Sequence, residues 1–147
     1  MKIICVGKIK EQYLRDGIAH YKKLIEKKYP IEIIEVQDEM TPDGASGKVE
    51  TRIKEIEGER IRKYINDGDY VVPLCIEGKQ LSSGRFADVC HSVLKEKGQE
   101  LVFVIGGSLG LDSKVVQRGQ MKLSFSAMTF PHQVMRMVLL EQLSRVI

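Results

Sequence analysis

The stretch Leu101-Val-Phe-Val-Ile105, followed by Gly106-Gly-Ser-Leu-Gly110, decides the fold class of this chain. Five consecutive apolar residues are typical of a strand that is buried on both faces, as in the middle of a parallel sheet. The glycines that follow end the strand and let a ligand approach bare backbone. On this feature alone, a tight structural turn and a ligand site are equally good interpretations.

Strands and helices alternate outward from this stretch in both directions. We expect strands at 2–6, 31–36, 70–76, 101–105 and 122–126, and helices at 10–28, 49–65, 83–97, 113–118 and 131–145. Such alternation predicts an α/β fold with a largely parallel sheet flanked by helices. Pro73, inside the third strand, predicts an edge position, a bulge or irregular pairing.

Length and composition predict one globular domain over residues 1–147. Hydrophobic residues make up 43% and charged residues 29% of the 147, which excludes a disordered chain. No apolar run approaches the roughly 18 residues of a membrane span, so we expect a cytoplasmic protein without a membrane partner. Three cysteines without a C-x-x-C pair argue against a disulfide framework and against a metal site.

Charge is unevenly distributed, although the net charge is only +3. Residues 1–30 carry eight Lys or Arg and three acids, whereas residues 31–69 carry six and eleven. The basic first helix has two interpretations, a solvated amphipathic helix or a surface that faces nucleic acid.

Ligands of open α/β sheets bind at the carboxyl ends of the strands, and three such ends are notable here: 74–79, 106–110 and 124–132. Neither a G-x-G-x-x-G fingerprint nor a G-x-x-x-x-G-K-[ST] loop is present, which disfavours dinucleotides and nucleoside triphosphates. Residues 124–132 are rich in small, hydroxyl and apolar side chains. They suit a neutral flat ring such as adenine, held by main-chain hydrogen bonds and by Leu74, Met128 or Phe130, or else they form an ordinary buried loop.

The last predicted helix is apolar on nearly all sides, which predicts burial all round and therefore a homodimer packed through this helix. His132 and Arg136 are spaced i, i+4 and share a face at its start. A helix N-terminus disfavours the cationic form, so we expect His132 to be neutral, as a capping residue or as a substrate contact. Arg136 is expected to bind a phosphate or to pair with an acid across the dimer.

Two of these segments together resemble one known family. Phe103-Val-Ile-Gly-Gly-Ser-Leu-Gly-Leu111, followed by Leu123-Ser-Phe-Ser-Ala-Met-Thr-Phe-Pro-His-Gln133, is similar to the RlmH family of 23S ribosomal RNA pseudouridine methyltransferases, in the SPOUT (trefoil-knot) superfamily. Val6-Gly-Lys8, Ile33-Ile-Glu-Val36 and Gly78-Lys79 with Ser82-Ser83 also fit. The resemblance covers almost the whole chain.

The resemblance implies a SPOUT α/β fold whose C-terminal segment forms a deep trefoil knot, and a homodimer through the last helix. It implies methyl transfer from S-adenosyl-L-methionine to N3 of a pseudouridine in 23S rRNA of assembled ribosomes, with S-adenosyl-L-homocysteine as product. His132 and Arg136 are then the candidate catalytic residues. The candidate cofactor-binding residues are Leu74, Gly106, Phe125, Ser126, Ala127, Met128, Thr129 and Phe130.

The C-terminal end departs from the family pattern. Members carry an aromatic residue where Ser144 stands and continue into a short basic tail that ends near a Tyr-His pair, whereas this sequence ends at Arg145-Val-Ile147. The resemblance places that tail near the cofactor and the RNA. Two alternatives follow: an active methyltransferase, or a catalytically impaired knotted dimer or ribosome-binding module.

Overall fold

The computed structural model describes all residues, 1–147, and its centre is a five-stranded parallel sheet with strand order β2-β1-β4-β3-β5. The strands are β1 (Lys2–Val6), β2 (Glu32–Val36), β3 (Tyr70–Gln80), β4 (Leu101–Ile105) and β5 (Leu123–Ser124). The helices are α1 (Gln12–Glu26), α2 (Gly47–Arg62), α3 (Ser83–His91), α4 (Ser113–Arg118) and α5 (His132–Val146), and a π-helical turn at Ser92–Glu96 extends α3.

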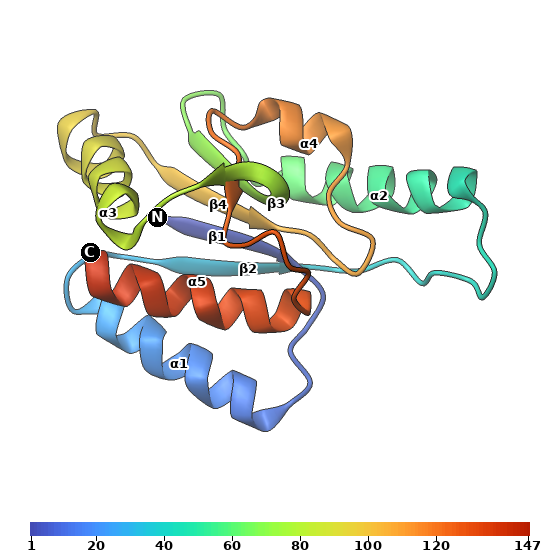
Figure 1. The fold of residues 1–147 in the computed structure, drawn as a ribbon, viewed down its shortest axis with the longest axis horizontal. Helices are drawn as coiled ribbons and strands as arrows, with labels where there is room; N and C mark the ends of the chain where they lie inside the picture. The colour runs from blue at the N-terminus through green and yellow to red at the C-terminus, as the bar shows by residue number, and fades with distance from the viewer.

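Helices cover both faces of the sheet (Figure 1). Alternate residues of β4 serve the two sides: Phe103 packs in a core with α1, α3 and α5, whereas Val102 and Val104 pack in a second core with α2 and α4. All five residues of β4 are buried, and the strand lies in the middle of the sheet. The predicted α/β class and the central place of this strand are therefore confirmed.

The element ends differ slightly from the prediction. α2 begins at Gly47, because the Ser46 hydroxyl caps it by accepting a hydrogen bond from the Val49 N–H at 3.4 Å. The Ser82 hydroxyl caps α3 in the same way, accepting a hydrogen bond from the Arg85 N–H at 3.2 Å. β3 runs on to Gln80, four residues beyond the predicted end at Ile76.

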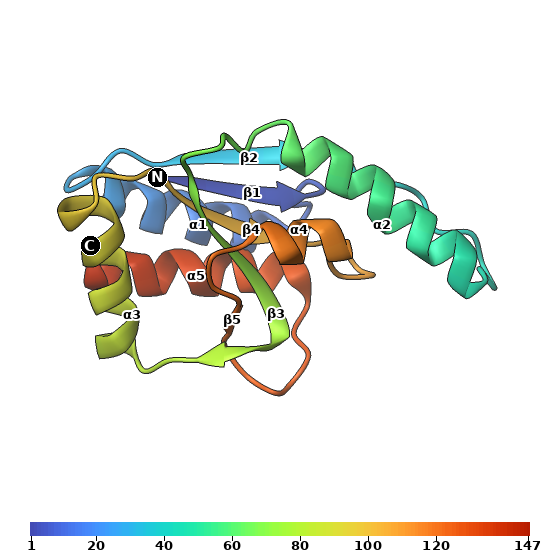
Figure 2. The same cartoon turned by 90° about the horizontal axis from the view of Figure 1, so that it is seen from above.

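The extension of β3 follows from the irregularity predicted at Pro73. Pairing with β4 ends at Pro73, which has no N–H to donate, and pairing with β5 then shifts register, so that both Leu74 and Lys79 oppose Leu123. Figure 2 shows β3 leaving the sheet and turning toward β5. Gly78 permits this close approach, because a Cβ there would lie 2.7 Å from the carbonyl carbon of Leu123.

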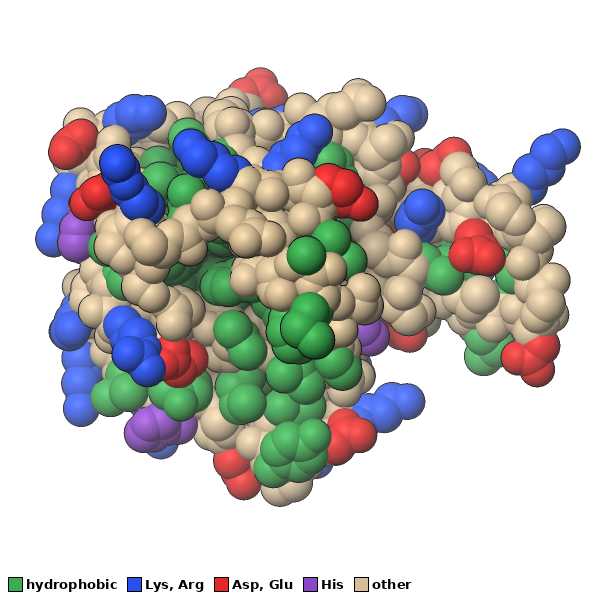
Figure 3. All heavy atoms as spheres, in the orientation of Figure 1, with side chains coloured by type: hydrophobic (Ala, Val, Ile, Leu, Met, Phe, Trp, Pro, Cys, Tyr) green, Lys and Arg blue, Asp and Glu red, His purple; other side chains and the backbone are tan.

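Helix α5 packs along α1 and against α3. Leu139, Leu140 and Leu143 are fully buried within the single chain. Other apolar side chains of α5, among them Val134 and Val138, are only half-buried. Figure 3 shows hydrophobic side chains gathered on the face that α5 and α1 form. The homodimer and the C-terminal knot stay predictions.

No helix combines the length and the apolarity that crossing a membrane would need. No group of three His, Cys, Asp or Glu side chains is arranged to hold a metal ion.

Candidate functional site

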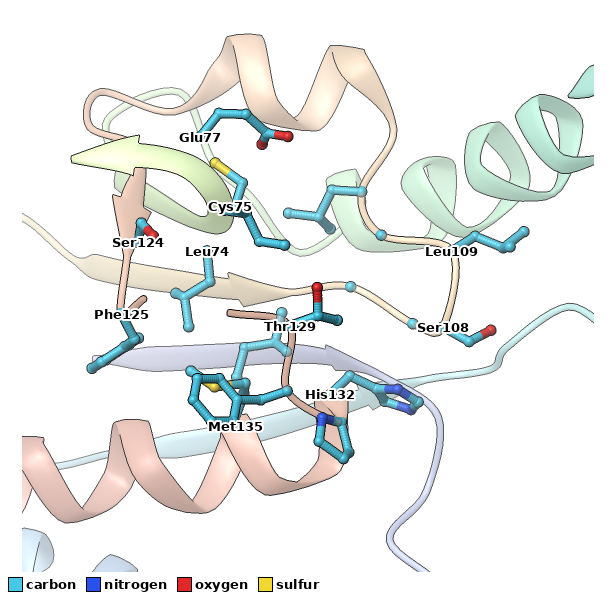
Figure 4. Close-up of a pocket in the computed structure, with 18 of the residues that line it drawn as sticks. Leu74, Cys75, Glu77, Ser108, Leu109, Ser124, Phe125, Thr129, His132 and Met135 are labelled. Carbon is cyan, nitrogen blue, oxygen red and sulfur yellow. The ribbon is translucent and has the colours of Figure 1, made fainter. Parts of the chain in front are cut away.

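A cavity of about 790 Å³ lies at the carboxyl ends of β3, β4 and β5 (Figure 4). The three stretches singled out in the sequence meet there, as expected for an open parallel sheet. Its volume falls in the range typical of small-molecule and cofactor sites. Eight of the ten predicted site residues line it: Leu74, Gly106, Phe125, Ser126, Met128, Thr129, Phe130 and His132.

One end of the cavity is apolar. Leu74, from the bend of β3, and Phe125, from the loop after β5, lie near one another there (Figure 4). Met128 and Phe130 reach the cavity from the same loop and remain 70% and 42% exposed. Exposed apolar side chains around a hollow mark a binding surface rather than a core, and this one suits a flat ring.

The loop between β5 and α5 holds its shape through its own serines. The Ser124 hydroxyl donates to the carbonyl of Ser126 at 3.0 Å, and the Ser126 hydroxyl accepts from the Met128 N–H at 3.0 Å. These bonds fix the backbone that faces the cavity. Ala127, which lies between them, does not line the cavity.

The opposite wall is the glycine turn after β4. The Gly110 N–H donates to the Gly107 carbonyl at 3.1 Å, and Gly110 has a φ of +89°, which favours glycine. A Cβ on Gly106 would lie 2.8 Å from the carbonyl carbon of Gly110, so only glycine fits at 106 without moving backbone. The segment is therefore a tight structural turn, and its exposed backbone also forms one wall of the cavity.

A buried carboxylate supports this turn from α2. Glu57 is 5% exposed, accepts a hydrogen bond from the Glu39 N–H at 3.0 Å, and lies beneath Gly107. Burial raises the pKa of Glu57 above its ordinary value. The side chain thus binds the segment after β2 and lies close to the glycine turn.

His132 lines the cavity from the first residue of α5. Partial burial lowers its pKa, the positive charge of Arg136 lowers it further, and Asp38 opposes the shift. The direction agrees with the predicted neutral imidazole, although the main cause is burial rather than the helix terminus.

This shift predicts a pH dependence of stability. The unfolded chain, in which the pKa of a histidine is about 6.5, binds the proton more readily than the folded chain. The free energy of unfolding should therefore fall as the pH drops from about 6.5 through the lowered pKa of His132. Above about pH 6.5, His132 should make no contribution to the pH dependence. Urea unfolding across this pH range should show a smaller fall in the free energy of unfolding for His132→Gln than for the wild type. The control His20→Gln, at an exposed residue, should show the same fall as the wild type.

Arg136 does not line the cavity and is turned away from it. Its side chain is 1% exposed, donates to Glu35 at 2.6 Å, and donates to the Gly7 carbonyl at 3.0 Å. Its acidic partner thus lies on β2 of the same chain, rather than across a dimer, and its guanidinium is not free for a phosphate. Arg136 instead fastens the start of α5 to the carboxyl ends of β1 and β2.

Several cavity residues were not predicted from the sequence, among them Lys54, Ser108 and Met135. Ser108 lies within 106–110, a strand end that the sequence already indicated as a candidate site, so its place in the cavity could have been predicted. Lys54 carried no local signal, because it lies in α2, about fifty residues before the glycine turn that it approaches.

Comparisons with known proteins agree with this fold. A family model described as "Predicted SPOUT methyltransferase" matches residues 1–147. A relative from Bifidobacterium animalis subsp. lactis, named "Ribosomal RNA large subunit methyltransferase H", is 52% identical over 143 residues, covering 97% of this chain and 90% of the relative. Proteins of the same name from Streptococcus equi subsp. zooepidemicus and Leuconostoc citreum are 47% and 48% identical over 145 residues, covering 99% of this chain and 91% of each relative.

A solved structure, that of a probable methylase family protein from Haemophilus influenzae Rd KW20, aligns with a TM-score of 0.56 at 10% identity. The alignment covers 99% of this chain and spans 65% of that chain. At this identity the likeness concerns the fold alone.

Proposed function

The chain belongs to the SPOUT methyltransferase family, and from this premise we propose that it transfers a methyl group from S-adenosyl-L-methionine to N3 of a pseudouridine in 23S ribosomal RNA of assembled ribosomes. The relatives' shared name supports ribosomal RNA as the substrate. The observation that carries the proposal is the cavity, in which an apolar end, a bare-backbone wall and a neutral histidine face one space.

The residues of the cavity fit the proposed methyl donor. Leu74, Phe125 and Met128 offer apolar surface to the two faces of an adenine ring, and backbone groups of the 125–130 loop offer hydrogen bonds to its edge. At Gly106 the backbone itself forms the wall, because no Cβ fits there. When bound, S-adenosyl-L-methionine supplies an activated methyl group on a sulfonium.

Because the methyl group is already activated, the chain's task is positioning. The two reacting partners must be aligned, and the N3–H proton of the base must leave to water. Glu77, the one carboxylate that lines the cavity, is exposed, and we assign it no part in this step. We assign the orientation of the base to His132 and to polar groups of the glycine turn. Arg136 fastens the start of α5, which carries His132, and so positions His132.

His132→Ala should reduce turnover on ribosomes about tenfold or more while leaving the affinity for S-adenosyl-L-homocysteine within about threefold. The reason is that the imidazole is proposed to face the base rather than the adenosyl group. Parallel measurements of turnover and of calorimetric affinity check this. Unchanged turnover on ribosomes would remove His132 from the mechanism.

We also propose that the protein acts as a homodimer packed through α5. Several apolar side chains of this helix are only half-buried in one chain, and hydrophobic side chains gather on the same face (Figure 3). A second copy would cover that surface.

Two measurements test the proposed function. Calorimetric titration with S-adenosyl-L-homocysteine should show saturable binding near one site per chain, and ATP and NAD should bind far more weakly. Methyl transfer should occur to ribosomes from a strain that lacks the modification and not to modified ribosomes. Binding without transfer would favour a catalytically impaired module, and a folded protein that binds no S-adenosyl-L-homocysteine would contradict the proposal.

A further inference from the structure

The cavity contains one cationic side chain that has no partner in the chain. Lys54, half-buried on α2, lines the wall beside the glycine turn. No ion pair or hydrogen bond engages its ammonium group. His132 is neutral, so the other charged side chain among the lining residues is the exposed Glu77.

The lack of a partner is notable because acids are close along the helix. Glu50 lies four residues before Lys54 and Glu57 three residues after it, the spacings at which helical ion pairs form. Neither carboxylate lies within 4.0 Å of the ammonium, and Glu57 instead accepts from the Glu39 N–H. Two of the other four cations of α2 are paired, Arg52 with Glu55 and Arg60 with Glu39, whereas Lys48 and Arg62 form no ion pair.

The position of α2 indicates which ligand Lys54 would meet. The helix approaches the cavity on the side of the glycine turn, near Leu109, and away from Leu74 and Phe125 (Figure 4). The apolar end is the part suited to an adenosyl group. Because Lys54 lines the cavity from this helix, we expect its ammonium group on the side that remains for the RNA.

Charge favours the same partner. The proposed methyl donor has a net positive charge, since its sulfonium and ammonium outweigh its one carboxylate, and a neighbouring ammonium repels that net charge. The target nucleotide brings phosphates, and a half-buried ammonium binds an anion more strongly than a fully hydrated one does. We propose that Lys54 contacts a phosphate next to the target base and so positions the RNA in the cavity. This inference rests on the proposed function and adds to it one contact, between Lys54 and the RNA.

The experiment compares Lys54→Gln with Lys54→Arg and with Lys48→Gln. Lys48 is an exposed residue of the same helix that does not line the cavity, so it controls for the loss of a charge. Lys54→Gln should raise KM for unmodified ribosomes roughly tenfold, as loss of one charge-assisted hydrogen bond predicts. The slope of log(kcat/KM) against log salt should become smaller in magnitude by about one. Lys54→Arg should restore most of the wild-type KM and most of the wild-type slope.

The affinity for S-adenosyl-L-homocysteine, measured by calorimetry, should be unchanged in Lys54→Gln. A fall in this affinity with an unchanged salt slope would overturn the proposal and place Lys54 on the donor's carboxylate. Equal effects of Lys54→Gln and Lys48→Gln would also overturn it. Should the wild type transfer no methyl group, the proposed function fails separately, and co-sedimentation with ribosomes still measures whether Lys54→Gln weakens RNA binding.

Discussion

Gly106→Ala should lower the affinity for S-adenosyl-L-homocysteine roughly ten- to hundredfold. The new Cβ would lie 2.8 Å from the carbonyl carbon of Gly110 and 2.9 Å from its oxygen, and backbone atoms cannot turn aside as a side chain does. The glycine turn must therefore shift, and this turn forms one wall of the cavity. Overpacking of this kind typically costs about 1–3 kcal/mol, and a cost of about 1.4–2.7 kcal/mol in the bound state corresponds to the stated loss of affinity.

The matched control is Gly68→Ala. A Cβ on Gly68 meets no atom within 4 Å, so the same chemical change there should leave the affinity unaltered. Circular dichroism and thermal unfolding of both variants separate a displaced turn from an unfolded chain. Wild-type affinity in a folded Gly106→Ala protein would show that the glycine turn is not part of the donor site.

Glu35→Ala should lower the free energy of unfolding by about 3–5 kcal/mol, although Glu35 itself is 37% exposed. The cost arises at its partner, because Arg136 is 1% exposed and would keep only the Gly7 carbonyl as an acceptor. The Nε atom of Arg136 already has no hydrogen-bond partner, so the guanidinium has no further acceptor to use. Chemical denaturation at one fixed protein concentration checks the loss, since dimerisation would make stability depend on concentration.

Two comparisons isolate the buried charge as the cause. Glu141→Ala breaks the surface pair with Arg145, whose side chain is 67% exposed, and should cost less than about 1 kcal/mol. The double variant Glu35→Ala with Arg136→Met removes both charges and should be more stable than Glu35→Ala alone. A double variant that is less stable than both single variants would contradict this account.

Much of the fold could be predicted from local patterns. The apolar run at 101–105 specified a central strand, and alternation along the chain specified a parallel sheet. Pro73 correctly indicated irregular pairing, because its missing N–H is a local property. The bend from Leu74 to Lys79 was not predicted, since it depends on how Gly78 meets Leu123 in another part of the chain.

The candidate site shows the same division. Residues at the ends of adjacent parallel strands could be brought together by a general rule, and Leu74, Gly106 and Phe125 do meet. Arg136 was expected to bind a phosphate or to pair with an acid across the dimer, but its partner Glu35 lies in the same chain, 101 residues away, and no spacing rule links the two. Lys54 was missed for the same reason, because the approach of α2 to the glycine turn is a tertiary contact.

The strand order has a kinetic consequence. β1 pairs with β4, so that Ile3 lies opposite Phe103, and the cavity joins segments near 74, 106 and 125 to the start of the last helix. Contacts between residues so distant in sequence raise the contact order, and such topologies fold slowly because long loops must close first. On the ribosome, the cavity cannot form until residues near His132 have been synthesised. The nascent chain is therefore expected to gain its ligand affinity only after α5 has been synthesised and has docked.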